Sequence, residues 1–308
     1  MTAQRRVVVL GGAGVVGRWV LRSLVRHPEQ VTTVDRAGQA DHTADVTDPP
    51  AHVRAAVATA DIVVLALPEQ TAARCLDWLA RTASEQAVIV STCSVQNPLF
   101  ARAREVGVPQ PVLGVNPMFS PTLHSAGRPV VLIAQRPDDE VDRLRTRLED
   151  GGMVVSVMGP EEHDTAMSLL QALPHAAVLA FAAALSEQPV DVEQLMRIAP
   201  PPARMLIALA CRILTAPAEI YWDIQEANPE SATRRAELLR SLSRLDSVVA
   251  GGDEDGFRTA LAAAADWLGP YTETGAQECH RLFDHLRTSP ANHRPEQDAP
   301  AGTSGVSA

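Results

Sequence analysis

A glycine-rich turn near the N-terminus constrains the fold of this chain more than any other feature. In VVVLGGAGVVGRWVLRSLV, an apolar strand precedes Gly12-x-Gly14-x-x-Gly17 and an apolar-periodic helix follows it. A second predicted strand, VTTVD, ends at Asp35, 18 positions after the last of these glycines. Strand, glycine loop, helix and a correctly spaced acid together form the fingerprint of a dinucleotide-binding domain. The chain is therefore predicted to begin with a Rossmann domain.

Each residue of the glycine loop has its own physical reason to bind a dinucleotide. Gly12 is expected to allow the tight turn, and Gly14 to let the backbone approach the pyrophosphate. Gly17 is expected to let the helix pack closely on the strand. The first helical turn, which begins with Val15 and Val16, should present backbone amides and a positive dipole end to the phosphates.

The residues beyond the loop indicate which dinucleotide is bound. Asp35 should accept hydrogen bonds from the adenosine ribose and repel a 2′-phosphate, so NAD is the expected cofactor. Arg36 keeps NADP as a less favoured alternative. Leu67 and Pro68, which end the predicted strand segment ADIVVLAL, are expected to border the same cofactor.

The same glycines also fit a second pattern, Gly11-x-x-Gly14-x-x-Gly17, which is the spacing of extended short-chain dehydrogenases. Catalysis in those enzymes needs a Tyr-x-x-x-Lys pair. The chain has two tyrosines and no lysine, since all 27 of its Lys and Arg residues are arginine. On this pattern it is predicted to be a non-catalytic, NAD-binding regulatory protein.

The distribution of β-branched and helical segments divides the chain near residue 160. Before it, short β-branched runs alternate with helical stretches, which predicts a parallel sheet covered on both faces. After it, long Ala/Leu-rich stretches predict helices, and the Pro-, Ser-, Ala- and Gly-rich end predicts disorder. We expect a Rossmann domain over 1–159, a helical domain over 160–288 and a disordered tail over 289–308. The predicted strands are RVVVLG, QVTTVD, ADIVVLAL, AVIVST, PVVLIA and MVVSVM.

Charge and cysteine content exclude several classes of function. A net charge of −10 argues against a nucleic-acid partner and against an anionic membrane surface. The four cysteines lie far apart, which predicts reduced thiols and no metal site. The N-terminus lacks a signal-peptide cleavage pattern, so a cytoplasmic location is expected. The longest apolar stretch, Leu169 to Leu185, is interrupted by polar residues and proline, and is predicted to be a buried helix rather than a membrane span.

Polar residues on two apolar helices mark a candidate ligand site. In the first helix four polar residues are spaced to share one face, which is either solvated or lines a site. They are Asp164, Ser168, Gln171 and His175. The second helix, ARMLIALACRIL, carries Arg204 and Arg212. An arginine in that setting extends to solvent or pairs with an anion, and a ligand carboxylate is the expected anion.

Four further segments follow one another along the chain: STCSVQNP, NPMFSP, EEHDTAMSLLQALPHAAVLAF and IYWDIQEAN. In their order and spacing they resemble segments of the prephenate dehydrogenases, the oxidoreductases of tyrosine biosynthesis. The resemblance runs from the glycine loop to about Leu286. The resemblance implies an NAD-binding Rossmann domain, and a helical domain that forms a homodimer. It also implies a small dicarboxylate substrate bound between the two domains, which loses a hydride from ring carbon 4 and carbon dioxide from carbon 1.

The resemblance also implies roles for single residues. Ser94 is expected to hydrogen-bond near the reacting substituent, and Arg212 to bind a substrate carboxylate. Arg204 is expected to support that site or the dimer contact, while His163 with Asp164 positions the domain junction or caps a helix. The residues expected to line the pocket are Gln171 and His175.

Two positions depart from the family's pattern. Gln96 replaces the lysine of its Ser-Val-Lys segment, and Asn116, in GVNPMFSP, replaces the histidine that accepts the proton of the substrate's 4-hydroxyl. Asparagine does not titrate, and loss of a positioned base typically lowers the rate by about 10²–10⁴-fold. Either the chain is a poor prephenate dehydrogenase, or the substituent on carbon 4 needs no base.

An amino substituent fits the second case, because a nitrogen lone pair supports the developing cation better than a hydroxyl oxygen does. Asn116 Oδ1 is able to accept one of its N–H bonds. The chain is thus predicted to resemble 4-amino-4-deoxyprephenate dehydrogenases, which make 4-aminophenylpyruvate in secondary-metabolite routes such as antibiotic biosynthesis. The alternative is a prephenate or arogenate dehydrogenase in which His124 or a water is the base. Ser120, which replaces a family glycine, is left without a role. The candidate catalytic residues are Asn116, Ser94 and His175.

Overall fold

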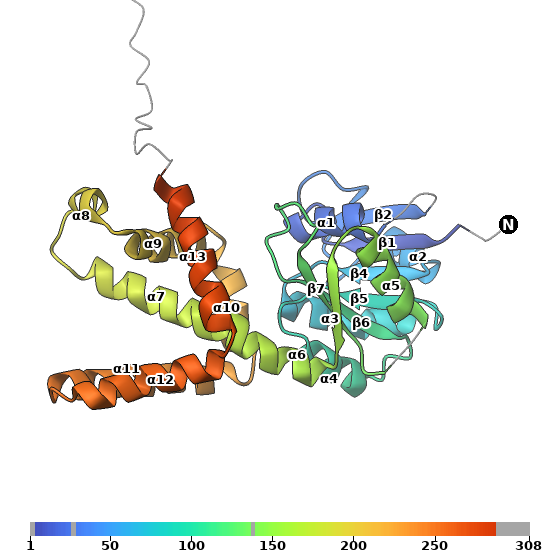
Figure 1. Ribbon diagram of the computed structural model, residues 1–308. Helices are drawn as coiled ribbons and strands as arrows, with labels where there is room; N and C mark the ends of the chain where they lie inside the picture. The colour runs from blue at the N-terminus through green and yellow to red at the C-terminus, as the bar shows by residue number, and fades with distance from the viewer. Residues whose placement is uncertain (1–3, 26–28, 137–138, 288–308) are drawn as a thin grey trace, which may run out of the picture. The chain divides into compact units, whose positions relative to one another are not determined.

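The computed structural model describes residues 4–25, 29–136 and 139–287, and its N-terminal part is built on one eight-stranded sheet (Figure 1). The strand order across the sheet is β3-β2-β1-β4-β5-β6-β7-β8. The strands are β1 (Arg6–Leu10), β2 (Gln30–Asp35), β3 (His42–Thr43), β4 (Ile62–Leu65), β5 (Val88–Ser91), β6 (Val112–Pro117), β7 (Pro129–Ile133) and β8 (Val154–Met158).

The six strands predicted from β-branched runs are all present, and GVNPMFSP begins in β6 as expected. The predicted parallel arrangement is confirmed for every neighbouring pair except β6 and β7, which are antiparallel. Residues 118–128, which join these two strands, contain no helix. A parallel connection needs a crossover of about a dozen residues or more, so a short helix-free link returns the chain in the opposite direction.

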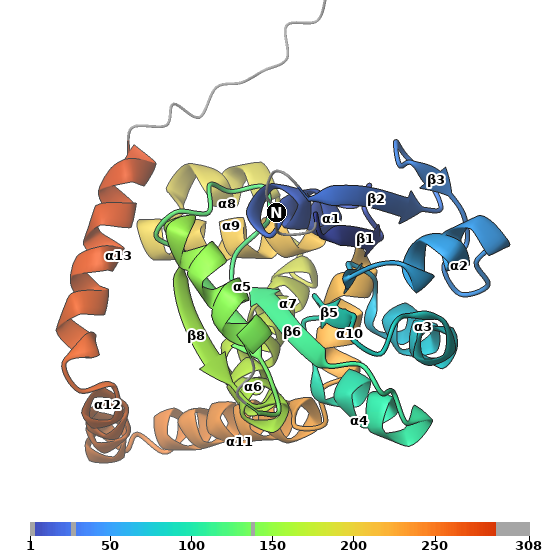
Figure 2. The same ribbon diagram turned by 90° about the vertical axis from the view of Figure 1, so that its right-hand side faces the viewer.

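Successive side chains of each strand point to opposite faces of the sheet, so the strands contribute to two separate cores, one on each face. On β1, Val8 and Leu10 join the core covered by α2 (Ala51–Ala58), α3 (Glu69–Thr82) and α4 (Asn97–Val106). Val7 and Val9 join the core covered by α1 (Val15–Ser23) and α5 (Asp139–Asp150). Figure 2 shows α3 and α4 side by side next to β5. The doubly wound sheet expected of a Rossmann domain is therefore confirmed.

From Pro160 to the last described residue, all regular structure is helical. The elements are α6 (Pro160–Met167), the π-helical turn η1 (Ser168–Ala172), α7 (Leu173–Ser186), α8 (Val192–Ile198), α9 (Pro201–Leu214), α10 (Ala218–Glu226), α11 (Ser231–Ala250), α12 (Glu254–Leu268) and α13 (Tyr271–Arg287). The predicted helical domain thus follows the sheet domain, and the predicted tail lies outside the described residues.

The chain packs as two compact units whose limits differ from the change in secondary structure. One unit contains residues up to Gln188 together with Leu209–Ser243. The other contains Pro189–Ala208 and the chain from Arg244 onward. Helices α6 and α7, the end of α9, α10 and the start of α11 therefore belong to the same unit as the sheet. A site that combines these helices with the sheet lies within one unit.

The apolar helix predicted to be buried is not buried within this chain. Helix α7 has no buried residue, and in the described chain Pro160–Ser186 is long and apolar enough to cross a membrane, with mean hydropathy 1.6. The bent pair α9 and α10 passes the same test of length and composition. The sequence shows that such a face is apolar but does not show what covers it. Helices that pack against a second protein chain have the same composition.

Candidate active site

The glycine loop leaves the end of β1 and enters α1. The positive φ required by the tight turn, 85°, is at Gly11, which corrects the assignment of the turn to Gly12. A Cβ on Gly12 would lie 2.8 Å from the Cβ of Thr33, so this glycine is needed for the approach of β2. Gly17 has the predicted packing role, because its Cβ would lie 2.1 Å from the carbonyl oxygen of Gly11.

The outer side of this loop fits the phosphates of a dinucleotide. A Cβ on Gly14 would meet a single neighbour, the Gly11 oxygen at 3.3 Å, so the loop backbone is open to a ligand there. Gly14 is also the N-cap of α1 and has no side chain to cap the first amides. Val15 and Val16 begin the helix as predicted, and free amides at a helix N-terminus bind phosphate.

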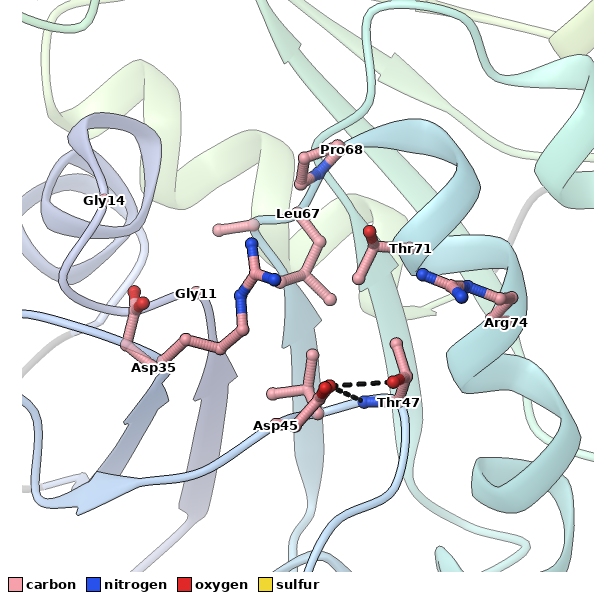
Figure 3. A pocket seen from close by; sticks show the side chains of 12 residues that line it. Gly11, Gly14, Asp35, Asp45, Thr47, Leu67, Pro68, Thr71 and Arg74 are labelled. Carbon is pink, nitrogen blue, oxygen red and sulfur yellow. Dashed lines mark hydrogen bonds between the residues drawn. The ribbon is translucent and has the colours of Figure 1, made fainter. Parts of the chain in front are cut away.

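Asp35 ends β2 beside a cavity of about 190 Å³ (Figure 3). Its Oδ2 accepts from the Ala13 amide at 3.0 Å, and its Oδ1 accepts from the Ala37 amide at 3.3 Å, so the loop fixes the carboxylate. Arg36, Leu67 and Pro68 line the same cavity, as the sequence predicted. These residues fit the adenosine end of NAD.

Sequence reasoning missed part of this cavity. Asp45 accepts from the Thr47 amide at 2.8 Å and from the Thr47 hydroxyl at 2.7 Å (Figure 3). These two hydrogen bonds and the nearby charges of Arg36 and Arg74 lower the pKa of Asp45. Thr71 and Arg74 reach the cavity from α3. No local pattern marks them, because they arrive by folding from another element.

Asn116 lies in β6 and is the first member of a buried hydrogen-bonded chain. Its Nδ2 lies 3.0 Å from Nε2 of His163, whose Nδ1 lies 2.7 Å from Oδ1 of Asp164. The exposed fractions of the three residues are 3%, 0% and 3%. An amide thus occupies the position that resembles the family's base, and a histidine is hydrogen-bonded to that amide. No local sequence pattern predicts that His163 lies there.

Asp164 joins this chain to the start of α4. Its two carboxylate oxygens accept from the amides of Gln96 at 2.9 Å and Asn97 at 2.7 Å. The Gln96 side chain is fully buried and donates to the Cys93 carbonyl at 2.7 Å. A Cβ on Gly114 would lie 2.8 Å from Gln96 Oε1. The residue that replaces the family's lysine therefore fills space against β6 and is sealed from solvent.

Ser94 follows β5 and is hydrogen-bonded to Glu69, an acidic residue that was not predicted from the sequence. Its amide donates to Oε1 of Glu69 at 2.9 Å, and Glu69 shares a hydrogen bond with Asp223 of α10. Burial, and then the hydrogen bond with Asp223, raise the pKa of Glu69 to about 7. Burial, and then the Glu69 charge, raise the pKa of the Cys93 thiol well above its usual range. Glu69 comes directly after Pro68, which lines the cofactor cavity.

The helical residues predicted to share one face have different surroundings. The carboxylate of Asp164 is bonded to the start of α4, and the Ser168 hydroxyl donates to Thr165 and accepts from Arg234. The shared face of the four residues stays a prediction. Between them lies η1, a π-helical turn, which changes the angular spacing of the residues after it.

Gln171 and His175 keep unpartnered atoms. Gln171 Oε1 and His175 Nδ1 are enclosed and have no hydrogen-bond partner in the part of the chain that the structure describes. The His175 ring packs edge-on against Tyr221, with a centroid distance of 5.0 Å. Burial, and then the charge of Arg212, lower the pKa of His175. Arg212 thus lies near enough to His175 for its charge to act on the imidazole, and the neutral form of the imidazole is favoured. Helix α10 supplies both Tyr221 and Asp223, which links this group to Glu69.

Three other residues considered from the sequence form no hydrogen bond, among the described residues, with the site residues above. Arg204 belongs to the second compact unit, where its guanidinium donates to the carbonyls of Met196 at 2.8 Å and Ala199 at 3.3 Å. Its role in substrate binding stays a prediction. His124 is exposed in the loop between β6 and β7, where it accepts from the Ala126 amide. The Ser120 hydroxyl bonds to that of Thr122 in the same loop, at 2.9 Å.

Comparisons with known proteins agree with this arrangement. Residues 159–263 match the family model "Prephenate dehydrogenase, dimerization domain", and residues 6–94 match "NADP oxidoreductase coenzyme F420-dependent". The chain is 39% identical to a 4-amino-4-deoxyprephenate dehydrogenase of Streptomyces pristinaespiralis, over 91% of this chain and 97% of that protein. It is 25% identical to a T-protein of Haemophilus influenzae, over 90% of this chain and 71% of that one.

Solved structures show the same fold. Synechocystis arogenate dehydrogenase superposes with a TM-score of 0.64 at 17% identity, covering 85% of this chain and 98% of that one. Prephenate dehydrogenase from A. aeolicus, in complex with hydroxyphenyl propionate and NAD+, superposes with a TM-score of 0.61 at 20% identity, covering 86% and 98%. Fold, glycine loop and sequence identity point to one family. The chain belongs to the prephenate dehydrogenases, a family of NAD-dependent oxidoreductases.

Proposed function

We propose that this chain catalyses the NAD-dependent oxidative decarboxylation of 4-amino-4-deoxyprephenate to 4-aminophenylpyruvate. The observation that carries the proposal is Asn116, a non-titrating amide at the position where the family has its base. The relative named 4-amino-4-deoxyprephenate dehydrogenase, which is 39% identical to this chain, supports the same substrate. A role in a secondary-metabolite route such as antibiotic biosynthesis follows from this substrate and stays a prediction.

The chemistry of an amino substituent explains why no histidine is needed at residue 116. When bound, NAD accepts the hydride that leaves ring carbon 4. The amine lone pair supports the positive charge that develops on that carbon, and the electron pair released with carbon dioxide from carbon 1 completes the aromatic ring. The arylamine keeps both of its N–H bonds through these steps. Asn116 Oδ1 accepts one of them without competing for the proton.

One proton must still be removed, because an aliphatic amine is largely an ammonium ion near neutral pH and has no free lone pair. We assign the acceptance of that proton to Glu69, which is hydrogen-bonded to the Ser94 amide and follows Pro68, a residue of the cofactor cavity. Burial and Asp223 raise the pKa of Glu69 to about 7, which suits an acceptor that works near neutral pH. The Ser94 hydroxyl is available to hydrogen-bond the reacting substituent.

The second group of residues fits the two carboxylates of the substrate. Arg212 is exposed on α9 and has no ion-pair partner among the described residues, so its guanidinium is free to bind a carboxylate. Gln171 and His175 are proposed to line the same pocket, because Gln171 Oε1 and His175 Nδ1 are enclosed and have no hydrogen-bond partner among the described residues. Asp35 favours NAD over NADP, since it would repel a 2′-phosphate.

The helical domain is proposed to form a homodimer. Residues 159–263 match the dimerisation domain of the family, and α7 exposes its apolar surface in the single chain. A second copy would cover such a surface, as obligate dimers do. The cytoplasmic location and the absence of nucleic-acid and membrane partners stay predictions.

The experiment follows NADH formation by purified protein with 4-amino-4-deoxyprephenate, prephenate and arogenate in parallel. Turnover of the amino compound at the highest kcat/KM is the expected result. If prephenate or arogenate were turned over faster, the proposed substrate would be wrong, and the exposed His124 or a water would be the base to test next. NAD binding without turnover of any of the three compounds would indicate a regulatory protein.

A further inference from the structure

The hydrogen bonds of Asn116 have a definite direction. The two carboxylate oxygens of Asp164 already accept from the amides of Gln96 and Asn97, and Oδ1 also lies 2.7 Å from Nδ1 of His163, so Nδ1 is the donor of that contact. The other ring nitrogen, Nε2, faces the Nδ2 amide group of Asn116 at 3.0 Å, and not its oxygen. An amide NH2 group only donates, so Nε2 is the acceptor, which is the pattern of an imidazole that carries its proton on Nδ1.

The second neighbour of the same amide nitrogen strengthens this orientation. Nδ2 also donates to Sδ of Met167 at 3.7 Å, so both N–H bonds of Asn116 are directed into the protein. Its Oδ1 has no partner among the described residues and is not among the atoms sealed from solvent. The side chain thus offers a ligand one acceptor and no donor.

We infer that His163, held by Asp164, is a positioning residue that orients Asn116 so that its carbonyl oxygen faces the nitrogen on carbon 4 of the substrate. This inference rests on the proposed function. An ammonium or amino group has more than one N–H donor, and the carbonyl oxygen of Asn116 accepts from one of them. A hydroxyl is able to donate its single O–H bond to the same oxygen, but its two lone pairs need donors, and this amide provides none. The orientation therefore selects for nitrogen over oxygen at carbon 4.

The test separates orientation from simple structural support. His163→Gln keeps an acceptor for Asn116 and a donor for Asp164, whereas His163→Leu has similar bulk and neither. We expect His163→Leu to lower kcat/KM on the amino compound by about 10- to 100-fold, because the amide is free to turn its donors outward. His163→Gln should stay within about threefold of the wild type. The ratio of kcat/KM for the amino compound to that for prephenate should fall only in the leucine variant.

A double-mutant cycle supplies the second readout. In an Asn116→Ala background, His163→Leu should have no further effect on kcat/KM, because its action passes through Asn116. NAD titration of every variant checks that the Rossmann domain is folded. Equal losses in the glutamine and leucine variants, or additive losses in the cycle, would show that His163 merely supports the fold, and would overturn the inference.

Histidine NMR keeps the inference testable apart from the substrate. With ¹⁵N-labelled histidine, the His163 signal, assigned by its loss in His163→Gln, should be that of the Nδ1–H tautomer. If that tautomer is found but the amino compound is not turned over, the proposed substrate fails, and the cycle on whichever compound is turned over decides the role of His163. An Nε2–H tautomer would overturn the inference even if the amino compound proves to be the substrate.

Discussion

Replacing Glu69 with glutamine should stabilise the folded chain above neutral pH and remove most of its activity. Burial, and then the hydrogen bond with Asp223, raise the pKa of Glu69 from 4.5 to about 7. Because the pKa is higher in the folded chain than in the unfolded one, the folded chain holds this proton more tightly. The stability gained from that proton is complete below about pH 4.5 and is lost as the pH rises through about 7.

The size of the effect follows from the same shift. At 1.36 kcal/mol per pH unit, ionising Glu69 lowers the free energy of unfolding by about 3 kcal/mol at pH 8 and above. A glutamine does not ionise. Its oxygen is able to accept from the Ser94 amide, which now donates to Glu69 Oε1 at 2.9 Å, and its NH2 group is able to donate to the Asp223 carboxylate. The substitution therefore avoids a buried charge, while the Ser94 amide and the Asp223 carboxylate each keep a hydrogen-bond partner.

Urea unfolding of the wild type, Glu69→Gln and Glu85→Gln at two pH values tests this reasoning. Glu85 is exposed, so its variant controls for loss of one negative charge. The stability advantage of Glu69→Gln over the wild type should grow by about 2 kcal/mol between about pH 5.5 and about pH 8.5, and the control should show no such growth. Its kcat/KM on the amino compound should fall by about 10²–10⁴-fold. A constant advantage, or a glutamine variant less stable than the wild type at the higher pH, would refute the account of Glu69.

Three substitutions test the rest of the site. Asn116→His should raise kcat/KM on prephenate by about 10²-fold or more, because it supplies a base, and an inactive variant would count against that argument. Arg212→Ala should raise KM for the dicarboxylate by about 10- to 100-fold and leave NAD affinity unchanged, as measured by steady-state kinetics and NAD titration; an equal loss of NAD binding would contradict it. Asp35→Ala should reduce the preference for NAD over NADP, measured as the ratio of kcat/KM values, and an unchanged ratio would mean that another residue sets it.

The cofactor loop was predictable from sequence because its requirements are local. A strand, three close glycines and a helix lie next to one another in the chain, and Asp35 ends the adjacent strand. One detail still depended on the backbone. Gly11 and Gly12 are adjacent, and only the dihedral angles show that the left-handed turn is at Gly11.

The partners of the proposed catalytic residues were not predictable, because they come from distant parts of the chain. His163 reaches Asn116 across 47 positions, and the Ser94 amide reaches Glu69 across 25. Composition and periodicity report on neighbours within a few residues, so neither contact leaves a local signal. The π-helical turn η1 was likewise not predictable, because an analysis of periodicity assumes 3.6 residues per turn throughout.

The arrangement at carbon 4 explains how a chain of this family can do without a histidine at residue 116. A base is useful there when the substituent is a hydroxyl, whose proton is held until the carbon begins to lose its hydride. An ammonium differs, because its proton has to leave first, before any charge develops on the ring. Its acceptor therefore need not act while the hydride leaves, and the carboxylate of Glu69, beside Ser94, is able to take that proton beforehand. Asn116 is then left with orientation alone, which a neutral amide fixed by His163 performs without placing a second cation beside the first.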